Sequence, residues 1–172
     1  MNKINFVLKA AVDKKGAIGS DNKLPWKLPK EMAMFLKRVR PFPVIMGRKT
    51  CESLYKPMNN QLNYVLTTDT SFKRKGFVVV HSIKELLSII NIEKTHFVVG
   101  GAQIYEEFMK LCMDNQNKMS MTVELTHIDT KVKNADTYFP MHLIEDYQMS
   151  SFDRNKDVEE DGTAWVEKVY YL

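Results

Sequence analysis

The sequence predicts one α/β domain with a mostly parallel central β-sheet, helices on both of its faces and an antiparallel strand at its C-terminal edge. Apolar runs of strand length alternate with helix-like segments along most of the chain, which is typical of parallel sheets. The last two strand-like segments are joined by a short acidic turn, as in an antiparallel hairpin. The 172 residues match the size of one domain and contain no repeat or linker, so we expect residues 1–172 to form a single unit.

The N-terminal half is expected to alternate between strands and helices. Its apolar runs predict strands at residues 4–12, 44–46, 62–67 and 77–80. A helix is expected over residues 29–40, which Pro41 ends because proline cannot continue a helix, and another over residues 48–55. Residues 13–27 are expected to form a loop, and its length suggests a functional role.

The C-terminal half continues this alternation and ends in the hairpin. Ser82 and Glu85 have the spacing of a capping box ahead of an amphipathic helix. A strand over residues 95–99 and a helix over 102–111 are expected to follow. The polar segment 112–120 is expected to protrude. Three late strands are expected at residues 121–128, 147–154 and 164–171, the last two joined by an acidic turn around residues 157–162.

Composition and charge exclude several classes of protein. The net charge of +4 is mild and its cations are spread along the chain, which disfavours a nucleic-acid surface. No apolar run approaches the ~20 residues needed to cross a bilayer, and the N-terminus resembles a strand rather than a signal peptide. Cys51 and Cys112 have no framework spacing, which favours a reducing cytoplasm. The four histidines lack metal-ligand spacing, so no metal is expected.

Glu31 is the acid around which a site could form. Pro29 suits the first position of a helix, which places Glu31 in the first turn and Phe35 one turn later on the same face. An acid beside Trp26, Met32 and Phe35 is either an ordinary surface residue at a helix N-terminus or a lone anion on the floor of an apolar pocket. Spacing alone favours the surface residue.

Two strand-to-helix junctions have the character of phosphate-binding sites. Gly47-Arg48-Lys49-Thr50 combines a glycine turn, two cations and a hydroxyl with a new helix N-terminus. Gly100-Gly101-Ala102-Gln103 lets backbone N–H groups approach an anion, and Thr67-Thr68 adds hydroxyls at the end of another strand. Each could also be only a tight turn or a packing device. Together they would suit the phosphates of a dinucleotide.

Five groups of residues occur in the order and spacing of one enzyme family. They are Gly16-Ala17-Ile18-Gly19, Leu24-Pro25-Trp26-Lys27-Leu28-Pro29, Val44-Ile45-Met46-Gly47-Arg48-Lys49-Thr50, Gly100-Gly101-Ala102-Gln103-Ile104-Tyr105, and Thr126-His127-Ile128 with Asp136-Thr137-Tyr138-Phe139-Pro140. In these residues the sequence resembles dihydrofolate reductase, from Ile4 to Tyr171. Each group alone is weak evidence, but five in register are very specific.

The resemblance implies a cytoplasmic, monomeric enzyme with the three-layer fold of that family. Its reaction would be NADPH-dependent reduction of 7,8-dihydrofolate to tetrahydrofolate, which supplies one-carbon metabolism and thymidylate synthesis. Hydride would pass to C6 of the pterin and a proton to N5. Glu31 would accept the 2-amino group and ring N–H of the pterin as a paired contact, with Thr126 as a bridging hydroxyl. Burial should raise the pKa of Glu31.

The resemblance also implies which residues form the site. Leu24 and Trp26 would close over the nicotinamide, Arg48 and Lys49 would select the 2′-phosphate of NADPH, and the Gly100–Gly101 peptide would be cis. The catalytic set would be Glu31, Trp26, Leu24 and Thr126. The substrate set would be Lys9, Ala10, Glu31, Met32, Phe35, Thr50, Leu54, Lys56, Met58, Gln61, Val99, Tyr105 and Thr126. The cofactor set would be Ala11, Ile18, Gly19, Leu24, Gly47, Arg48, Lys49, Thr50, Leu66, Thr67, Thr68, Val99, Gly100, Gly101, Ala102, Gln103, Ile104 and Tyr105.

Two residues depart from the family pattern. Gln61 occupies the place of the arginine that grips the α-carboxylate of the substrate's glutamate tail, and a neutral amide cannot form that ion pair. Lys56, Lys37 or Arg38 could compensate from the rim. Lys9 replaces an aliphatic residue in the first strand. We expect Lys9 either to extend out to solvent, which is favoured, or to approach Glu31 and alter its titration.

Two other functions remain open at this stage. One is a reductase of the same fold that acts on a pterin or pyrimidine without the glutamate tail, which Gln61 favours. The other is a protein that binds a nucleotide or pterin without catalysis. The presence of Glu31, Trp26, Thr126 and both glycine junctions in one chain argues against the second.

Overall fold

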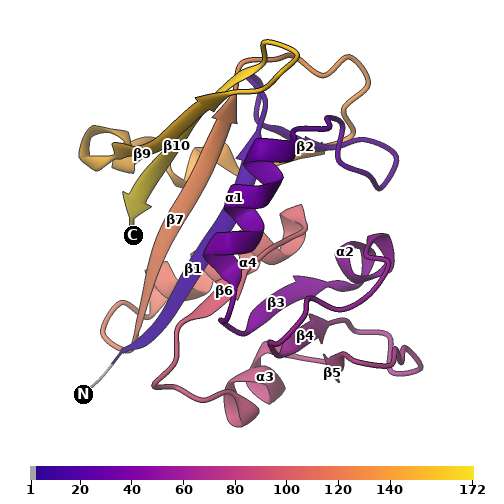
Figure 1. Ribbon diagram of the computed structural model, residues 1–172. Coiled ribbons are helices and arrows are strands. Elements are labelled where there is room, and N and C mark those ends of the chain that lie inside the picture. The colour runs from indigo at the N-terminus through magenta and orange to yellow at the C-terminus, as the bar shows by residue number, and fades with distance from the viewer. Residues whose placement is uncertain (1–2) are drawn as a thin grey trace.

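A computed structural model describes residues 3–172 and consists of an eight-stranded sheet with helices packed on both faces (Figure 1). The strand order is β5-β4-β3-β6-β1-β7-β10-β9. The strands are β1 (Ile4–Val12), β3 (Val44–Gly47), β4 (Asn63–Leu66), β5 (Val78–Val80), β6 (His96–Val98), β7 (Met119–Ile128), β9 (Phe152–Val158) and β10 (Ala164–Tyr171). Two further strands, β2 (Ala17–Gly19) and β8 (Thr137–Tyr138), pair separately.

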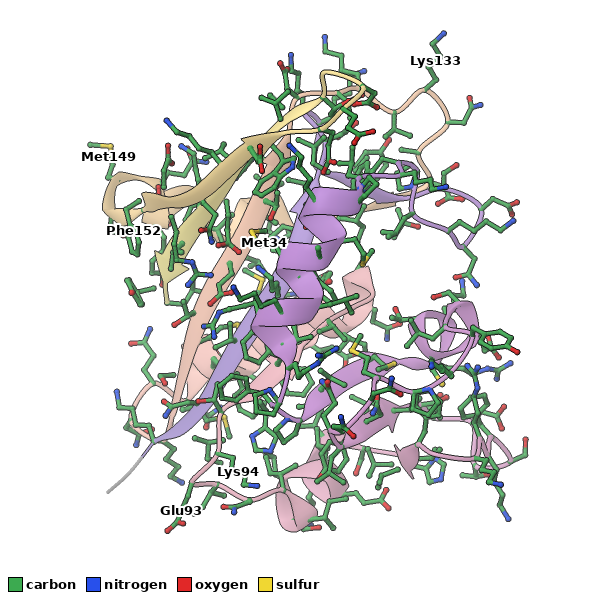
Figure 2. All side chains as sticks on the ribbon, viewed as in Figure 1. Met34, Glu93, Lys94, Lys133, Met149 and Phe152 are labelled. Atoms are coloured by element: carbon green, nitrogen blue, oxygen red, sulfur yellow. The ribbon has the colours of Figure 1, made fainter. Side chains whose placement is uncertain are left out.

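The sheet is parallel except at its C-terminal side, as the sequence predicts. β1 pairs in parallel with β6 and β7, and β3 pairs in parallel with β4 and β6. β10 runs antiparallel to both β7 and β9, so the C-terminal hairpin completes the sheet and β9 is its edge. Met149 and Phe152 project outward beside this edge (Figure 2).

The helices divide between the two faces of the sheet. They are α1 (Pro29–Val39), α2 (Arg48–Ser53), α3 (Ile83–Ile89) and α4 (Ala102–Asp114), with 3₁₀ helices η1 (Met141–Leu143) and η2 (Glu145–Ser150). Val39 of α1 and Cys51 of α2 belong to a core on one face, whereas Leu86 of α3 and Phe108 of α4 belong to the larger core on the other. Figure 1 shows α1 in front of β1 and α4 behind the sheet.

Local signals explain where several elements begin. Pro29 occupies the first turn of α1, and Ser82 caps α3 by accepting a hydrogen bond from the Glu85 N–H at 3.0 Å. The Glu85 carboxylate in turn accepts the N–H of His81 at 2.7 Å. The predicted capping box is therefore present, with its return contact one residue earlier than expected.

Three predicted boundaries are wrong. β7 begins at Met119 rather than at residue 121. α4 continues to Asp114 and buries Cys112 to 2% exposure, so the segment that leaves the core starts after this helix rather than at residue 112. The expected strand over residues 147–154 begins only at Phe152, because the chain first forms η2. No helix within residues 3–172 is long and apolar enough to cross a membrane.

Candidate active site

A cleft of about 1300 Å³ opens at the carboxyl ends of the parallel strands. Residues at or near the ends of β1, β3 and β4 line it, as do residues of α1 and α2 and the start of α4. This is the place where open α/β sheets bind ligands. Every residue of the expected catalytic, substrate and cofactor sets lines the cleft except Thr126.

Glu31 is a buried acid on the floor of this cleft. Its side chain is 5% exposed and lies among cleft residues that include Met32 and Phe35. Burial raises the pKa of Glu31 from its ordinary value of 4.5 to about 7. Lys9 and Thr126 oppose this rise, whereas the carboxylates of Glu167 and Glu159 add to it. Glu31 is therefore a buried acid of the pocket and not the surface acid that spacing alone favours.

Thr126 lies beneath the cleft wall beside Glu31. It pairs in register with Ala11 of β1, and its side chain is fully buried. Its hydroxyl oxygen has no hydrogen-bond partner among residues 3–172, although it is near enough to Glu31 to lower the pKa of that acid. A buried hydroxyl without a partner is costly unless a ligand or water satisfies it.

Glu159 holds the helix turn that carries Glu31, a role that the sequence did not suggest. Its carboxylate accepts the backbone N–H groups of Lys30 at 3.1 Å and Glu31 at 3.0 Å, and the indole N–H of Trp165 at 3.2 Å. Leu28, at the N-cap position, offers no side-chain acceptor, so an acid from the β9–β10 turn satisfies these first-turn donors. The sequence shows Glu159 only as part of an acidic turn.

The two glycine junctions meet side by side. The Gly47 N–H donates to the carbonyl of Gly100 at 2.7 Å. A Cβ on Gly47 would lie 2.9 Å from Cγ1 of Ile104, and Gly100 adopts a φ of +118°, so both positions need glycine. The Gly100–Gly101 peptide is cis, as expected from the resemblance. The hydroxyl oxygen of Thr50 lies 3.7 Å from the position of a Cβ on Gly101.

Arg48 is held at the rim by two carboxylates. Its guanidinium donates to Glu52 at 2.9 Å and to Asp69 at 2.6 Å, and it lies over the ring of Phe72 at 5.4 Å. The hydrogen bond with Glu52 is the main cause that raises the pKa of Arg48. An anionic group of a ligand would have to compete with these carboxylates for the arginine.

The loop before α1 covers one end of the cleft. Trp26 is half-buried against Leu28 and Trp165, whereas Leu24 is 53% exposed. Gly19, in the short strand β2, pairs with Thr137 of β8. Trp26 is therefore anchored to the body of the protein, while Leu24 lies at the exposed edge of the cleft.

At the expected tail-binding end, Gln61 is engaged with the backbone. Its amide donates to the carbonyl of Phe42 at 2.9 Å. Of the cations expected to compensate, Lys56 lines the cleft, but Arg38 is paired with Glu124 and faces the sheet. Arg40 also lines the cleft. The sequence did not indicate this role, because Arg40 is only the last residue of a predicted helix.

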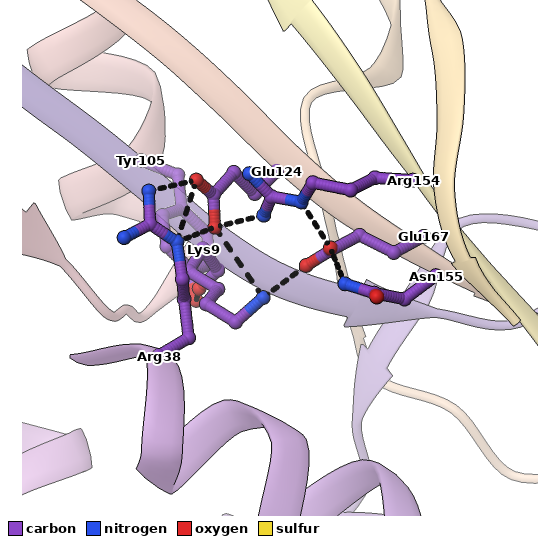
Figure 3. A network of polar contacts seen from close by, with 7 residues as sticks. All are labelled: Lys9, Arg38, Tyr105, Glu124, Arg154, Asn155 and Glu167. Atoms are coloured by element: carbon purple, nitrogen blue, oxygen red, sulfur yellow. Dashed lines mark hydrogen bonds and ion pairs between the residues drawn. The ribbon is translucent and has the colours of Figure 1, made fainter. Parts of the chain in front are cut away.

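The favoured expectation for Lys9 is wrong. Its side chain is 1% exposed and its ammonium group forms ion pairs with Glu124 and Glu167, as Figure 3 shows. These partners come from β7 and β10, far along the chain. The other alternative agrees with the structure in part, because the charge of Lys9 lowers the pKa of Glu31.

The sequence of this chain is similar to those of known enzymes. A model of the family described as dihydrofolate reductase matches residues 4–171. The chain belongs to the dihydrofolate reductase family. It is 38% identical to a curated dihydrofolate reductase of Staphylococcus aureus over 141 residues, which cover 82% of this chain and 81% of that protein. It is 41% identical to the Bacillus subtilis dihydrofolate reductase over 104 residues, or 60% and 61% of the two chains.

A solved dihydrofolate reductase also shares the fold. The Enterococcus faecalis enzyme, complexed with NADP(H) and RAB-propyl, superposes with a TM-score of 0.77 and 22% identity over 98% of this chain and 97% of that one. As to metals, residues 3–172 contain no group of three or more His, Cys, Asp or Glu side chains that could hold an ion.

Proposed function

We propose that this chain is an NADPH-dependent dihydrofolate reductase that converts 7,8-dihydrofolate to 5,6,7,8-tetrahydrofolate. The observation that carries the proposal is the buried Glu31, with a pKa of about 7, on the floor of a cleft that also contains two adjoining glycine junctions. An acid that titrates near neutrality suits a reaction that couples proton and hydride delivery.

Glu31 binds and orients the pterin in this proposal. Its carboxylate accepts the 2-amino group and the adjacent ring N–H as two charge-assisted hydrogen bonds. The hydroxyl of Thr126 completes this contact in the proposal, which its lack of another partner supports. NADPH, when bound, supplies the hydride for C6. Glu31 favours protonation at N5 while a water delivers the proton, and Trp26 and Leu24 limit the access of other water.

The residues at the other half of the cleft fit a dinucleotide phosphate. Because positions 47 and 100 are glycines, no side chain there keeps a phosphate away from the backbone. Arg48 and Lys49 would take the 2′-phosphate, beside the hydroxyl of Thr68. Thr50 and the N-terminus of α4 after Gly101 would hold the pyrophosphate.

A second substrate class is favoured by one observation. Gln61 cannot form an ion pair with the α-carboxylate of a glutamate tail, and its amide is already bonded to Phe42. A pterin without that tail would not need this contact. Binding of dihydrofolate in this chain would instead rely on Lys56 and Arg40, which line the same cleft.

The test is the loss of nicotinamide absorbance when the protein is mixed with NADPH and either dihydrofolate or a dihydropterin that lacks glutamate. We expect turnover with dihydrofolate and a lower KM in Gln61→Arg, by roughly tenfold or more for a restored charged hydrogen bond. Turnover with only the glutamate-free pterin would show that the substrate is a pterin without the glutamate tail and not dihydrofolate. If the protein binds NADPH but oxidises it in neither mixture, the proposal that it is a reductase is refuted. We also propose that the protein is cytoplasmic and monomeric.

A further inference from the structure

A cluster of charged side chains lies buried between α1 and the sheet, next to the cleft (Figure 3). At its centre is Lys9 of β1, whose Nζ lies 3.5 Å from Oε2 of Glu124 and also pairs with Glu167. Lys9 and Glu124 are opposite each other in the β1–β7 register. All three side chains are at most 1% exposed. A charged group at this depth is costly unless its partners are held in place.

Two arginines hold the carboxylates from outside. Arg38 of α1 donates to Glu124 at 2.6 Å, and Arg154 of β9 lies 2.7 Å from Glu124 and 2.8 Å from Glu167. Burial raises the pKa of Glu167, but Arg154, Lys9 and Asn155 outweigh it and lower the pKa to about 2. Arg154, Arg38 and Lys9 likewise outweigh burial and lower the pKa of Glu124. Both carboxylates therefore stay ionised at neutral pH.

The cluster carries more positive than negative charge. Three cations, Lys9, Arg38 and Arg154, face two carboxylates, Glu124 and Glu167. The surplus is one positive charge. Arg38 and Arg154 are about one-third exposed, so water screens their charges more than that of Lys9.

Glu31 lies near enough to this cluster to respond to its charges, because Lys9 lowers its pKa and Glu167 raises it. Lys9 and Glu31 line the same cleft. The polar groups that interact electrostatically with Glu31 come from several elements: Lys9 from β1, Thr126 from β7, Glu167 from β10, Glu159 from the turn before β10, and Tyr105 from α4. Lys9 is the cation of this set, and burial raises the pKa of the Tyr105 phenol, so that side chain stays neutral. Lys9 is thus placed to balance a charge on Glu31.

We propose that Lys9 is a positioning residue for the reaction: its buried ammonium is the counter-ion that allows Glu31 to carry negative charge in the cleft, and Glu124 and Glu167 hold that ammonium in place. The consequence for turnover rests on the proposed function, because it assumes that ionised Glu31 grips the substrate. The alternative is that the cluster only ties α1 to the sheet and leaves Glu31 unaffected.

The test measures the ionisation of Glu31 directly in the ligand-free protein. The side-chain carboxyl carbons of glutamate are labelled with ¹³C, Glu31→Gln identifies the resonance of Glu31, and its titration is followed by NMR. Lys9→Met should raise the pKa of Glu31 by about one pH unit or more, since a nearby opposite charge shifts a carboxyl by 1–3 units. Glu167→Gln should lower it, and the double variant should fall between the two single variants.

Both single substitutions break the same ion pair, so a structural effect on the pKa of Glu31 would have the same sign in each. Lys9→Met removes a positive charge and Glu167→Gln a negative one, so an effect of charge shifts this pKa in opposite directions. A purely structural cluster would give shifts of one sign, or none, and would overturn the proposal. If Lys9→Met does not fold, as judged by circular dichroism, the comparison of Glu167→Gln with the double variant decides. Glu31 must then titrate at higher pH in the double variant.

Kinetics supply a second readout and separate this proposal from the proposed function. At pH 7, Lys9→Met should raise the KM for dihydrofolate by roughly fivefold, because a pKa raised by one unit lowers the ionised fraction of Glu31 by that factor. The KM should recover at higher pH. If the wild type does not reduce dihydrofolate, the proposed function fails while the NMR result still stands. If it turns over normally and the pKa of Glu31 does not change in any variant, the role of Lys9 fails alone.

Discussion

Replacing Glu31 by glutamine should stabilise the protein, and increasingly so at higher pH. Burial raises the pKa of Glu31 from 4.5 to about 7, so between these values the folded protein binds a proton that the unfolded chain releases. The free energy of unfolding of the wild type must then fall as the pH rises through this window. Glutamine has nearly the same shape and no charge, so it is free of this penalty.

The size of the effect follows from the shift in the pKa. Each unit of pKa shift is worth about 1.4 kcal/mol, so a shift of roughly 2.5 units amounts to about 3.5 kcal/mol when Glu31 is fully ionised. Between pH 5 and pH 8.5, linkage gives a change of about 2.5 kcal/mol in the wild type relative to Glu31→Gln. For a domain of this size, that corresponds to a difference of roughly 5–10 °C in Tm.

The assay is urea unfolding of both proteins at pH 5 and pH 8.5 without ligands. Any effect of glutamine on packing is present at both pH values and cancels in the difference. We expect Glu31→Gln to gain about 2.5 kcal/mol over the wild type between the two conditions. An offset that is the same at both pH values would refute the reasoning, because Glu31 would then have an ordinary pKa.

Two further predictions concern the groups around Glu31 and at the rim of the cleft. Arg48→Ala should weaken NADPH binding tenfold or more, since a charged hydrogen bond is worth about 1.5–3 kcal/mol, while NADH binding changes little; quenching of protein fluorescence measures both, and equal losses would remove Arg48 from the 2′-phosphate site. Glu159→Gln should lower the free energy of unfolding by about 1–2 kcal/mol, because it weakens the acceptor for the first turn of α1. Urea titration measures this change, and a variant as stable as the wild type would contradict the capping role.

Features that depend on neighbouring residues were predictable from the sequence. The start of α1 at Pro29, the cap at Ser82 and the turn at Gly47 are each decided by a few adjacent residues. The end of α4 was missed because Cys112 continues the apolar face of Phe108 and Met109, whereas the polar residues after it suggested an exposed segment. Tertiary packing decides that boundary.

The environment of Lys9 was not predictable in the same way. Its partners lie 115 and 158 residues away in the chain, and only the strand order brings β1, β7 and β10 together. A lone lysine in an apolar strand suggests a side chain that reaches water, unless acids from two other strands are known to meet it. Glu159 was missed for a similar reason, since it contacts Lys30 and Glu31 across some 130 residues.

The most direct test of the central claim is a crystal structure of this chain with NADPH and folate bound. We predict that the 2-amino edge of the pterin lies within hydrogen-bond distance of Glu31, with the nicotinamide between that ring and the Gly100–Gly101 peptide. A pterin bound elsewhere, with Glu31 facing water or protein alone, would contradict the account.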